Sequence, residues 1–318
     1  MIIILVPVAE KCVNNVLDWL IASEVSFMRI TPEVPPSIEI CIENSEIEYK
    51  INDLLESNIS CFWVRKGYMT YATNLDSEET NIIAKTLLDY LSTEFDILSD
   101  YLLRQLESKK HLGNYFDRTP NKLHYLKFAT EVGLTIPNTL VTSKKTTLVN
   151  FKLSKGELIT KSIKDSFNVV NSKSHYYNNT ERIADEHIES MPDSFFSTLV
   201  QENIRKKIEL RIIFINQTLY SAAIFSQNNP KTQTDWRNQN LDKPNRIVPF
   251  KLPPIVVEKV QRFIKKSGLN IGAIDMIVTP EDDFVFLECN PNGQIGMVSE
   301  SCNYFIESHI ANFLKNEK

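Results

Sequence analysis

The stretch IGAIDMIVTPEDDFVFLECNPNG, residues 271–293, holds the pattern that decides the fold. Two apolar runs flank a polar turn, which predicts an antiparallel hairpin. If residues 280–283 form the turn, Asp275 lies opposite Glu288, and Asn290 shares their face. Like charges directly across a ladder repel, so this pair requires a cation between them or one raised carboxyl pKa. Solvated side chains in a slipped register are the alternative.

Asp275, Glu288 and Asn290 offer hard oxygen ligands. So few protein oxygens suit Mg²⁺, which completes its shell with water and phosphate oxygens. Pro291 ends the second strand and the next two residues turn the chain, which leaves the site open to a substrate. The hairpin therefore indicates a magnesium site that serves a nucleotide.

The glycines exclude the commonest nucleotide-binding motifs. Only eight occur, and they form neither G-x-G-x-x-G nor G-x-x-x-x-G-K-[ST]. A bound nucleotide would therefore require a fold other than a dinucleotide-binding or P-loop fold.

Residues 207–226 predict a second hairpin with a two-residue turn. Alternation places Glu209 and Arg211 on one polar, solvated face. An arginine beside an acid orients a phosphate or carboxylate well, and a surface ion pair is the alternative. Asp235 and Arg237 form a similar but less specific pair.

The first third of the chain predicts an open α/β layer followed by a long helix. An apolar strand at 2–8 and helical spacing at 13–21 indicate the layer. Helical periodicity continues through 77–106, and the polar segment 107–121 then suggests a crossing between domains. The helix has an apolar stripe that we expect to be buried, made of Ile82, Ile83, Leu87, Leu88, Leu91, Phe95, Leu98, Leu102 and Leu106. The same stripe is compatible with a homodimer seam.

Composition narrows the functional classes. The 318 residues carry 35 Lys and Arg against 40 Asp and Glu, a net charge of −5, so a sequence-blind nucleic-acid binder is disfavoured. Five cysteines without a C-x-x-C pair and five histidines without ligand spacing support neither a disulfide framework nor a zinc site. The sequence shows no signal peptide or membrane span, and we expect a cytoplasmic protein with reduced thiols.

Several motifs, taken in order, resemble the ATP-grasp ligases. They are Lys122, G-x-x-x-P-x-T at 133–139, Lys161, Q-E-N-I at 201–204, E-L-R at 209–211, Asp275 and F-L-E-C-N-P-N-G-Q at 286–294. Four segments resemble, more narrowly, the graspetide synthetases, which are microviridin-type peptide macrocyclases and include the grasp-with-spasm branch and the chryseoviridin-type ligase. These segments are W-V-R-K at 63–66, D-W-R at 235–237, R-x-V-P-F-x-L-P-P at 246–254 and the E-C-N-P-N-G-Q ending.

The resemblance implies an ATP-grasp fold of the α/β (α+β) class. Residues 1–115 would form an N-terminal open α/β pre-ATP-grasp domain, 116–200 a central lid subdomain, and 201–318 a C-terminal catalytic subdomain with the metal-binding hairpin.

The resemblance also implies roles for individual residues. Lys122 and Lys161 would hold ATP phosphates, and Arg211 would stabilise the transferred phosphoryl group. The nucleotide would also contact Gln201, Glu202, Asn203, Ile204 and Glu209, with the hinge 202–204 reading adenine. Asp275, Glu288 and Asn290 would bind Mg²⁺, as two ions. Asp235, Arg237, Arg65 and Lys66 would contribute around the acceptor site.

The activity implied is ATP-dependent macrocyclisation of a ribosomally made precursor peptide whose leader segment docks on the enzyme. Side-chain Asp or Glu carboxylates would become acyl phosphates and then ω-esters of Thr or Ser hydroxyls, or amides of Lys. Charge neutralisation, rather than a protein acid or base, drives such a phosphoryl transfer. Neither nucleic acid nor membrane takes part.

Two alternatives stay open. A carboxylate-amine ligase that modifies a peptide or protein tail would share every nucleotide-binding residue. A catalytically degenerate peptide-binding adaptor is suggested by the lid segment 162–181, which lacks the glycines that the family carries there.

Overall fold

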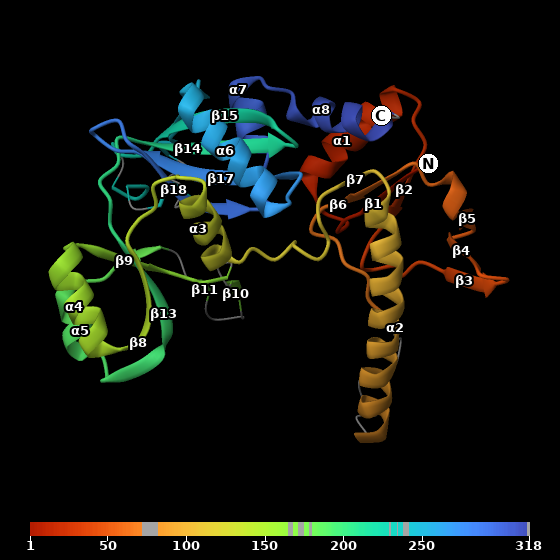
Figure 1. Ribbon diagram of the computed structural model, residues 1–318, viewed down its shortest axis with the longest axis horizontal. Coiled ribbons are helices and arrows are strands. Elements are labelled where there is room, and N and C mark those ends of the chain that lie inside the picture. The colour runs from red at the N-terminus through yellow and green to blue at the C-terminus, as the bar shows by residue number, and fades with distance from the viewer. Residues whose placement is uncertain are drawn as a thin grey trace. The chain divides into compact units, whose positions relative to one another are not determined.

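The computed structural model describes residues 1–71, 82–164, 168–170, 175–177, 180–228, 230–233, 235–237 and 242–316, the side chains of 83–84, 168–170 and 175–177 excepted. The chain forms two compact units (Figure 1). The first comprises Met1–Arg118, Gln294–Gly296 and Phe305–Lys318, and the second comprises Thr119–Gly293 and Met297–Tyr304.

A parallel four-stranded sheet, in the order β2-β1-β6-β7, lies at the centre of the first unit. Strands β1 and β6 are buried along their whole length. Their sequences, IIIL and CFWV, are therefore continuous apolar runs, as in parallel strands covered on both faces. The strands are β1 (Ile2–Leu5), β2 (Phe27–Ile30), β6 (Cys61–Val64) and β7 (His111–Leu112).

Helices from both ends of the sequence complete the first unit. Helix α1 (Lys11–Ala22) buries one apolar stripe and contacts α8 (Ile306–Lys315). The expected division placed all of 201–318 in a C-terminal subdomain, whereas the structure groups α8 with the N-terminal residues.

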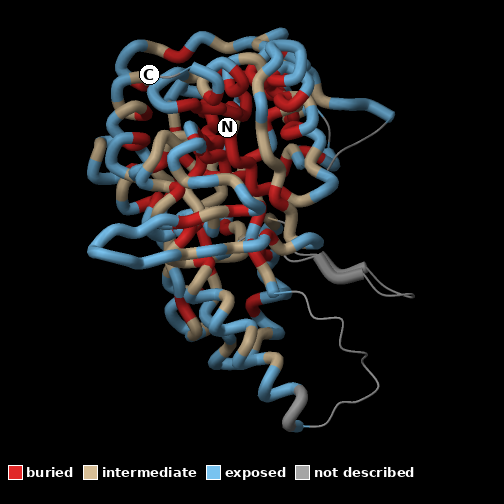
Figure 2. The backbone as a smooth tube through the Cα atoms, turned by 90° about the vertical axis from the view of Figure 1, so that its right-hand side faces the viewer, coloured by how far each residue is buried: buried red, intermediate tan, exposed pale blue. Residues whose placement is uncertain are grey.

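Helix α2 (Ile82–Ser108) is buried only in its last turns. Leu102 and Leu106 are fully buried, but Ile82 is 82% and Leu87 51% exposed. The predicted buried stripe is therefore wrong for the first half of the helix, which Figure 2 shows mostly in the exposed colour. The reason is length: 27 residues of helix extend about 40 Å, far beyond the short strands β6 and β7 that α2 contacts. The expected start at residue 77 lies outside the described residues.

A small antiparallel sheet, in the order β3-β4-β5, also belongs to the first unit. Its main hairpin turns at Asn44 and Ser45, both with positive φ. Tyr49 of β4 is buried in the core, whereas the hairpin tip is exposed and acidic. The elements are β3 (Ile38–Glu43), β4 (Glu46–Ile51), β5 (Leu54–Leu55) and the short 3-10 helix η1 (Glu56–Asn58).

The second unit begins with α3 and a four-stranded antiparallel sheet, in the order β12-β9-β13-β8. Helices α4 and α5 cover one face of this sheet through an apolar cluster that includes Leu148, Leu158 and Ile188. A separate hairpin pairs β10 with β11. The elements are α3 (Lys122–Glu131), β8 (Thr139–Lys144), α4 (Lys145–Lys155), β9 (Leu158–Lys161), β10 (Asn168–Val170), β11 (His175–Tyr177), β12 (Glu181–Arg182), α5 (Asp185–Ser190) and β13 (Ser194–Glu202).

A five-stranded antiparallel sheet, in the order β16-β15-β14-β17-β18, completes the second unit. Helices α3 and α6 bury one face of it through residues such as Tyr125, Phe263 and Phe286. The predicted two-residue turn of the second hairpin is confirmed, because Ile215 pairs with Thr218. The elements are β14 (Ile208–Ile215), β15 (Thr218–Phe225), β16 (Arg246–Pro249), α6 (Pro254–Ser267), β17 (Ile271–Val278), β18 (Phe284–Asn290) and α7 (Gly296–Cys302).

Two further features bear on the sequence predictions. None of the helices in the described ranges combines the length and hydropathy needed to cross a bilayer. The five cysteines are free thiols, of which Cys41 alone is exposed.

Candidate functional site

Strands β17 and β18 form the predicted hairpin, and Asp275 lies opposite Glu288 as predicted. The predicted register at the turn is wrong by one residue, because Phe284 pairs with Val278 rather than with Thr279. The pairing of the two strands therefore shifts by one residue between Met276, on the side of the turn, and Asp275.

The irregularity is a β-bulge at Leu287. Phe286 pairs with Met276, and Glu288 is the next paired residue of β18, so Leu287 is an extra residue in that strand. Phe286 and Cys289 both belong to the apolar core. Strict alternation would place Glu288 on the same face as Phe286. The bulge therefore transfers Glu288 to the opposite, polar face, where Asp275 lies.

Arg211 of β14 holds Asp275 from the neighbouring strand. Its Nη1 donates to both carboxylate oxygens of Asp275, at 2.9 and 2.8 Å. Burial raises the pKa of Asp275, and the Arg211 guanidinium opposes that rise. A Cβ at Gly293 would lie 2.3 Å from Cβ of Ala273 and 2.9 Å from Nη2 of Arg211, so a residue without a side chain is needed there. Glu209 and Arg211 share one face as predicted, but that face is buried rather than solvated.

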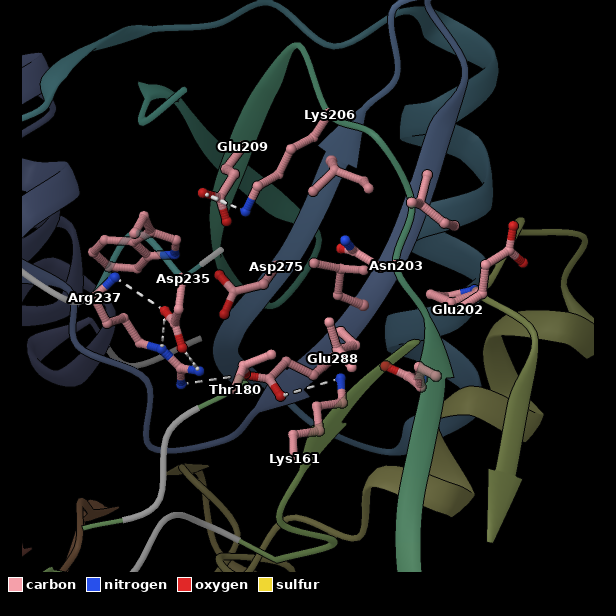
Figure 3. A pocket seen from close by; sticks show the side chains of 17 residues that line it. Lys161, Thr180, Glu202, Asn203, Lys206, Glu209, Asp235, Arg237, Asp275 and Glu288 are labelled. Carbon is pink, nitrogen blue, oxygen red and sulfur yellow. Dashed lines mark hydrogen bonds and ion pairs between the residues drawn. The ribbon is translucent and has the colours of Figure 1, made fainter. Parts of the chain in front are cut away.

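Glu288 lies among three cationic side chains, of which Figure 3 draws Lys161 and Arg237. Its carboxylate oxygens are 3.4 Å from Nζ of Lys122, 3.9 Å from Nζ of Lys161 and 3.6 Å from Nη1 of Arg237. Burial opposes ionisation of Glu288, but these three cations outweigh it and lower the pKa to about 2. Glu288 is therefore an anion at neutral pH.

Lys122 and Lys161 reach Glu288 from different elements. Lys122 is the first residue of α3, a helix whose start is capped by the Asn121 side chain. Its Nζ also donates to the backbone oxygen of Ser162 at 3.0 Å. Lys161 ends β9, and burial lowers its pKa while Glu288 opposes the change.

Asp235 and Arg237 form a tight pair in the loop between β15 and β16. Nε and Nη2 of Arg237 donate to the two Asp235 oxygens at 2.9 and 2.7 Å, and the Arg237 backbone amide donates at 3.0 Å. Burial acts to raise the pKa of Asp235, but its bonds with Arg237 lower it overall. The intervening Trp236 ring lies 6.0 Å from the Arg211 guanidinium.

Glu209 anchors another part of the polar face. Its carboxylate is 3.0 Å from Nζ of Lys206 and accepts a hydrogen bond of 2.6 Å from the Ser226 hydroxyl. Burial raises the pKa of Glu209, and the lysine and serine moderate the rise.

The chain leaving β13 forms another wall of the same cavity. Gln201 is buried, and Glu202 accepts a hydrogen bond of 2.6 Å from the Asn138 side chain. The Asn203 side chain donates to Glu157 at 2.9 Å. Ile204 adds an apolar surface.

These side chains line one cavity, with about 660 Å³ of space not occupied by protein, the open mouth included. The cavity gathers predicted residues from six separate stretches of sequence: Lys161, Gln201, Glu202, Asn203, Ile204, Glu209, Asp235, Arg237, Asp275 and Glu288. Arg211 and Lys122 reach it through their ion pairs with Asp275 and Glu288.

Three predicted residues are placed differently. Asn290 pairs with Ala273, and its side-chain oxygen accepts a hydrogen bond of 2.8 Å from the Asn292 amide. Arg65 and Lys66 belong to the first unit, where both pair with Glu10, at 3.5 and 2.8 Å. None of the three lines the cavity.

The cavity also contains residues that the sequence analysis did not select. Lys206 and Trp236 line it, as do the apolar side chains Ile159, Ile277 and Leu287. Lys206 lies in the irregular segment before β14, where neither helical nor strand periodicity could have indicated its contact with Glu209. The bulged Leu287 gave no signal either.

Comparisons with known proteins identify the fold. No protein-family model and no curated protein matches the chain. An ATP-grasp ligase associated with ribosomally made, modified peptides in Chryseobacterium gregarium, solved with ADP, a leader and a core peptide, is 22% identical, with a TM-score of 0.79 over 98% of this chain and 94% of that one.

Two other solved structures are similar. Macrocyclase MdnC from Microcystis aeruginosa, bound to precursor peptide MdnA, is 24% identical, with a TM-score of 0.77 and 98% of each chain covered. The ATP-grasp ligase PsnB, solved with a minimal precursor, Mg and ADP, is 14% identical, with a TM-score of 0.74 over 98% of this chain and 96% of that one. The chain therefore has the predicted ATP-grasp fold over nearly its whole length.

Proposed function

We propose that the protein is an ATP- and Mg²⁺-dependent ligase that forms ω-ester macrocycles in a ribosomally made precursor peptide. It activates Asp or Glu side-chain carboxylates as acyl phosphates and joins them to Thr or Ser hydroxyls. The observation that carries the proposal is the balance of charges in the cavity: Asp275 and Glu288, opposed across a hairpin, are paired with four cationic side chains.

The residues of this site fit a nucleotide with magnesium. Among the described residues, no three His, Cys, Asp or Glu side chains gather to hold a metal. Two carboxylates alone leave most of an octahedral shell to water and phosphate oxygens, which is the mode that Mg²⁺ favours. Asp275 and Glu288 would bind two Mg²⁺ ions. Asn290, which ends the strand that carries Glu288, would be a further ligand. Bound there, Mg²⁺ would neutralise charge on the phosphates.

The cations of the site suit the phosphoryl transfer. Lys122 and Lys161 would exchange their ion pairs with Glu288 for contacts with the nucleotide phosphates. Both ammonium groups already lie within 4 Å of the Glu288 carboxylate, which would bind the magnesium. Arg211 would stabilise the transferred group from the adjacent strand. Their positions are fixed by a helix start, a strand end and a strand interior, so the site requires little rearrangement to receive charge.

The reaction proceeds in two balanced steps. A peptide carboxylate oxygen attacks the γ-phosphorus of ATP, the bond to the β-phosphate oxygen breaks, and ADP leaves. A peptide hydroxyl oxygen then attacks the acyl carbon, phosphate leaves with the bonding electrons, and the hydroxyl proton passes to phosphate or solvent. Each ring therefore costs one ATP and removes the elements of one water from the peptide.

Asp235 and Arg237 would position the acceptor side of the reaction. Arg237 is half exposed and reaches both Asp235 and Glu288, so it lies where a substrate carboxylate would approach the phosphates. Arg65 and Lys66, which belong to the first unit, would contribute to the acceptor side by contacting the peptide. The likeness to ligases solved with leader and core peptides supports a peptide substrate with a leader, and we place the reaction in the cytoplasm, where ATP is available.

Intact-mass spectrometry tests the proposal. The enzyme is incubated with Mg²⁺, ATP and a candidate precursor rich in Thr and Asp or Glu. We expect the peptide to lose the mass of one water per bond, with equimolar ADP, and mild alkaline hydrolysis to restore the mass. Glu288→Gln serves as the inactive control.

Other outcomes identify the alternatives. A gain in peptide mass would indicate a carboxylate-amine ligase. Nucleotide binding without ADP formation, with every carboxylate tried, would indicate a peptide-binding adaptor. Either result overturns the macrocyclase proposal.

A further inference from the structure

Trp236 is the only aromatic residue among the described residues that line the cavity. It lies in the loop between β15 and β16 and is partly exposed, whereas the preceding Asp235 is buried. A residue that lines a cavity and also meets solvent forms part of the boundary between the two. Trp236 therefore stands between the proposed reaction site and bulk water.

The neighbours of Trp236 in the sequence hold this loop against the site. Asp235 accepts hydrogen bonds of 2.7–3.0 Å from the backbone amide and the guanidinium of Arg237, and Arg237 lies 3.6 Å from Glu288 of β18 (Figure 3). The Asn245 side chain also donates to the Trp236 backbone oxygen at 3.5 Å. The loop is therefore fixed to the hairpin that carries the opposed carboxylates.

The Trp236 ring lies beside the guanidinium that would stabilise the transferred phosphoryl group. Its centroid is 6.0 Å from Cζ of Arg211. Arg211 is 7% exposed, and its Nε is buried without a hydrogen-bond partner within the described part of the chain. Solvent does not reach this side of the guanidinium, so the aromatic ring stands next to a dry part of the cavity.

An acyl phosphate formed at this place could react with either of two acceptors. A peptide hydroxyl that attacks the acyl carbon forms the ester. Water that attacks the same carbon regenerates the carboxylate, so one ATP is consumed without a bond. In both reactions phosphate leaves with the bonding electrons, and the proton of the attacking oxygen passes to phosphate or solvent. An active site suppresses the second reaction by excluding water.

We propose that Trp236 excludes water from the acyl phosphate and so determines the specificity for a peptide hydroxyl over water. The inference rests on the proposed macrocyclisation and names what keeps it coupled to ATP. Tryptophan has the largest side chain, and its truncation to alanine would leave room for several water molecules, each of which occupies about 30 Å³ in the liquid. Removing the ring therefore opens the reaction site from the solvent side.

The ratio of ADP formed to ester bonds formed tests the proposal on the full chain with Mg²⁺, ATP and the candidate precursor. We expect about one ADP per bond for wild type and at least about fivefold more ADP per bond for Trp236→Ala. Trp236→Phe keeps an aromatic ring and should stay within about twofold of wild type. Trp236→Leu should give an intermediate ratio, and it replaces the alanine variant if that variant lacks a cooperative thermal melt. The ratio compares two products of the same molecules, so it is independent of the folded fraction.

Water labelled with heavy oxygen identifies the reaction that produces the extra ADP. Attack of water on the acyl carbon places the label in Asp or Glu side chains of the peptide, where mass spectrometry detects it. Label in phosphate alone would mean that water attacks phosphorus, which overturns the inference. Phe196→Ala is the control, because it removes an aromatic side chain that is 88% exposed and does not line the cavity. It should keep the wild-type ratio.

The remaining outcomes separate the inference from the proposed function. If Trp236→Ala acts only by displacing Arg237, ADP formation falls and the ratio stays at one, which overturns the inference and leaves the macrocyclase proposal intact. The same holds if Trp236→Ala matches wild type in both rate and ratio. Wild-type protein that forms no bond with any precursor overturns both.

Discussion

Two hairpins of this protein place like charges directly across a ladder, with opposite consequences. In β3–β4, Glu43 pairs with Glu46, and in β17–β18, Asp275 pairs with Glu288. The first pair is exposed at a hairpin tip, whereas the side chains of the second are 12 and 13% exposed.

The difference lies in what neutralises each pair. At the β3–β4 tip, water and salt screen the repulsion, and nearby Lys50 forms an ordinary surface ion pair with Glu39 at 2.9 Å. In the cavity, water is largely excluded and four protein cations take its place. A pair of opposed acids therefore indicates a binding site only where the surrounding fold buries it and supplies cations.

The largest contrast is expected in turnover. Glu288→Gln should reduce Mg²⁺-dependent ADP formation by at least about 100-fold, because it removes one of two candidate metal ligands and the anion that organises Lys122 and Lys161. Glu46→Gln, the matched change in the exposed hairpin, should leave the rate unchanged. Equal rates in the two variants would remove Glu288 from the proposed site.

The next contrast concerns stability. Arg211→Leu leaves Asp275 buried without the guanidinium that donates to both of its oxygens, and should lower the free energy of unfolding by about 3–5 kcal/mol, measured by urea denaturation. Replacing both residues by leucine should recover most of the loss, since the uncompensated charge is then gone. Lys50→Gln breaks the exposed pair and should produce no measurable change.

Acid should act on the buried pair through Glu288. Its pKa is about 2 in the folded protein against an ordinary value near 4.5, so the unfolded chain binds more protons between these pH values. The stabilisation is complete above pH 4.5 and is lost as the pH falls through 2. Over that interval Glu288→Gln should lose less stability than wild type, by on the order of 3 kcal/mol. Parallel curves for the two proteins would contradict the expectation.

The smallest effect is expected from thiol modification, since each hairpin carries one cysteine. Cys41 in β3 is exposed, while Cys289 in β18 is buried and burial raises its pKa. A thiol-specific chromophoric reagent should modify one cysteine rapidly in native protein and all five after denaturation, and ADP formation should survive the rapid phase. Rapid reaction of Cys289 would show that the β17–β18 hairpin opens.

Much of the site follows from local patterns in the sequence. The opposed carboxylates and the second hairpin were both predicted, because alternation and turn composition act over a few residues. The resemblance to ATP-grasp ligases supplied the fold, which the structural comparisons confirm.

What the sequence did not predict depends on contacts distant along the chain. A bulge at Leu287 reflects packing of Phe286 and Cys289 against the same core, which no periodicity encodes. The apolar stripe of α2 is continuous, yet the strands that cover it are short, so burial ends midway. The solvated face expected for Glu209 and Arg211 is buried for a similar reason, since loop residues such as Trp236 approach it from outside the hairpin.

Helix α8 has a consequence for how the chain acquires its structure during synthesis. It contacts α1, and Lys110 donates to the backbone oxygens of Phe313 and Asn316 near its end, so the first unit is built from segments that lie on both sides of the second unit in the sequence. A ribosome therefore releases all the strands of the second unit before the helix that covers α1 has been translated. The first unit therefore cannot be completed until α8, which follows the second unit in the sequence, has been translated.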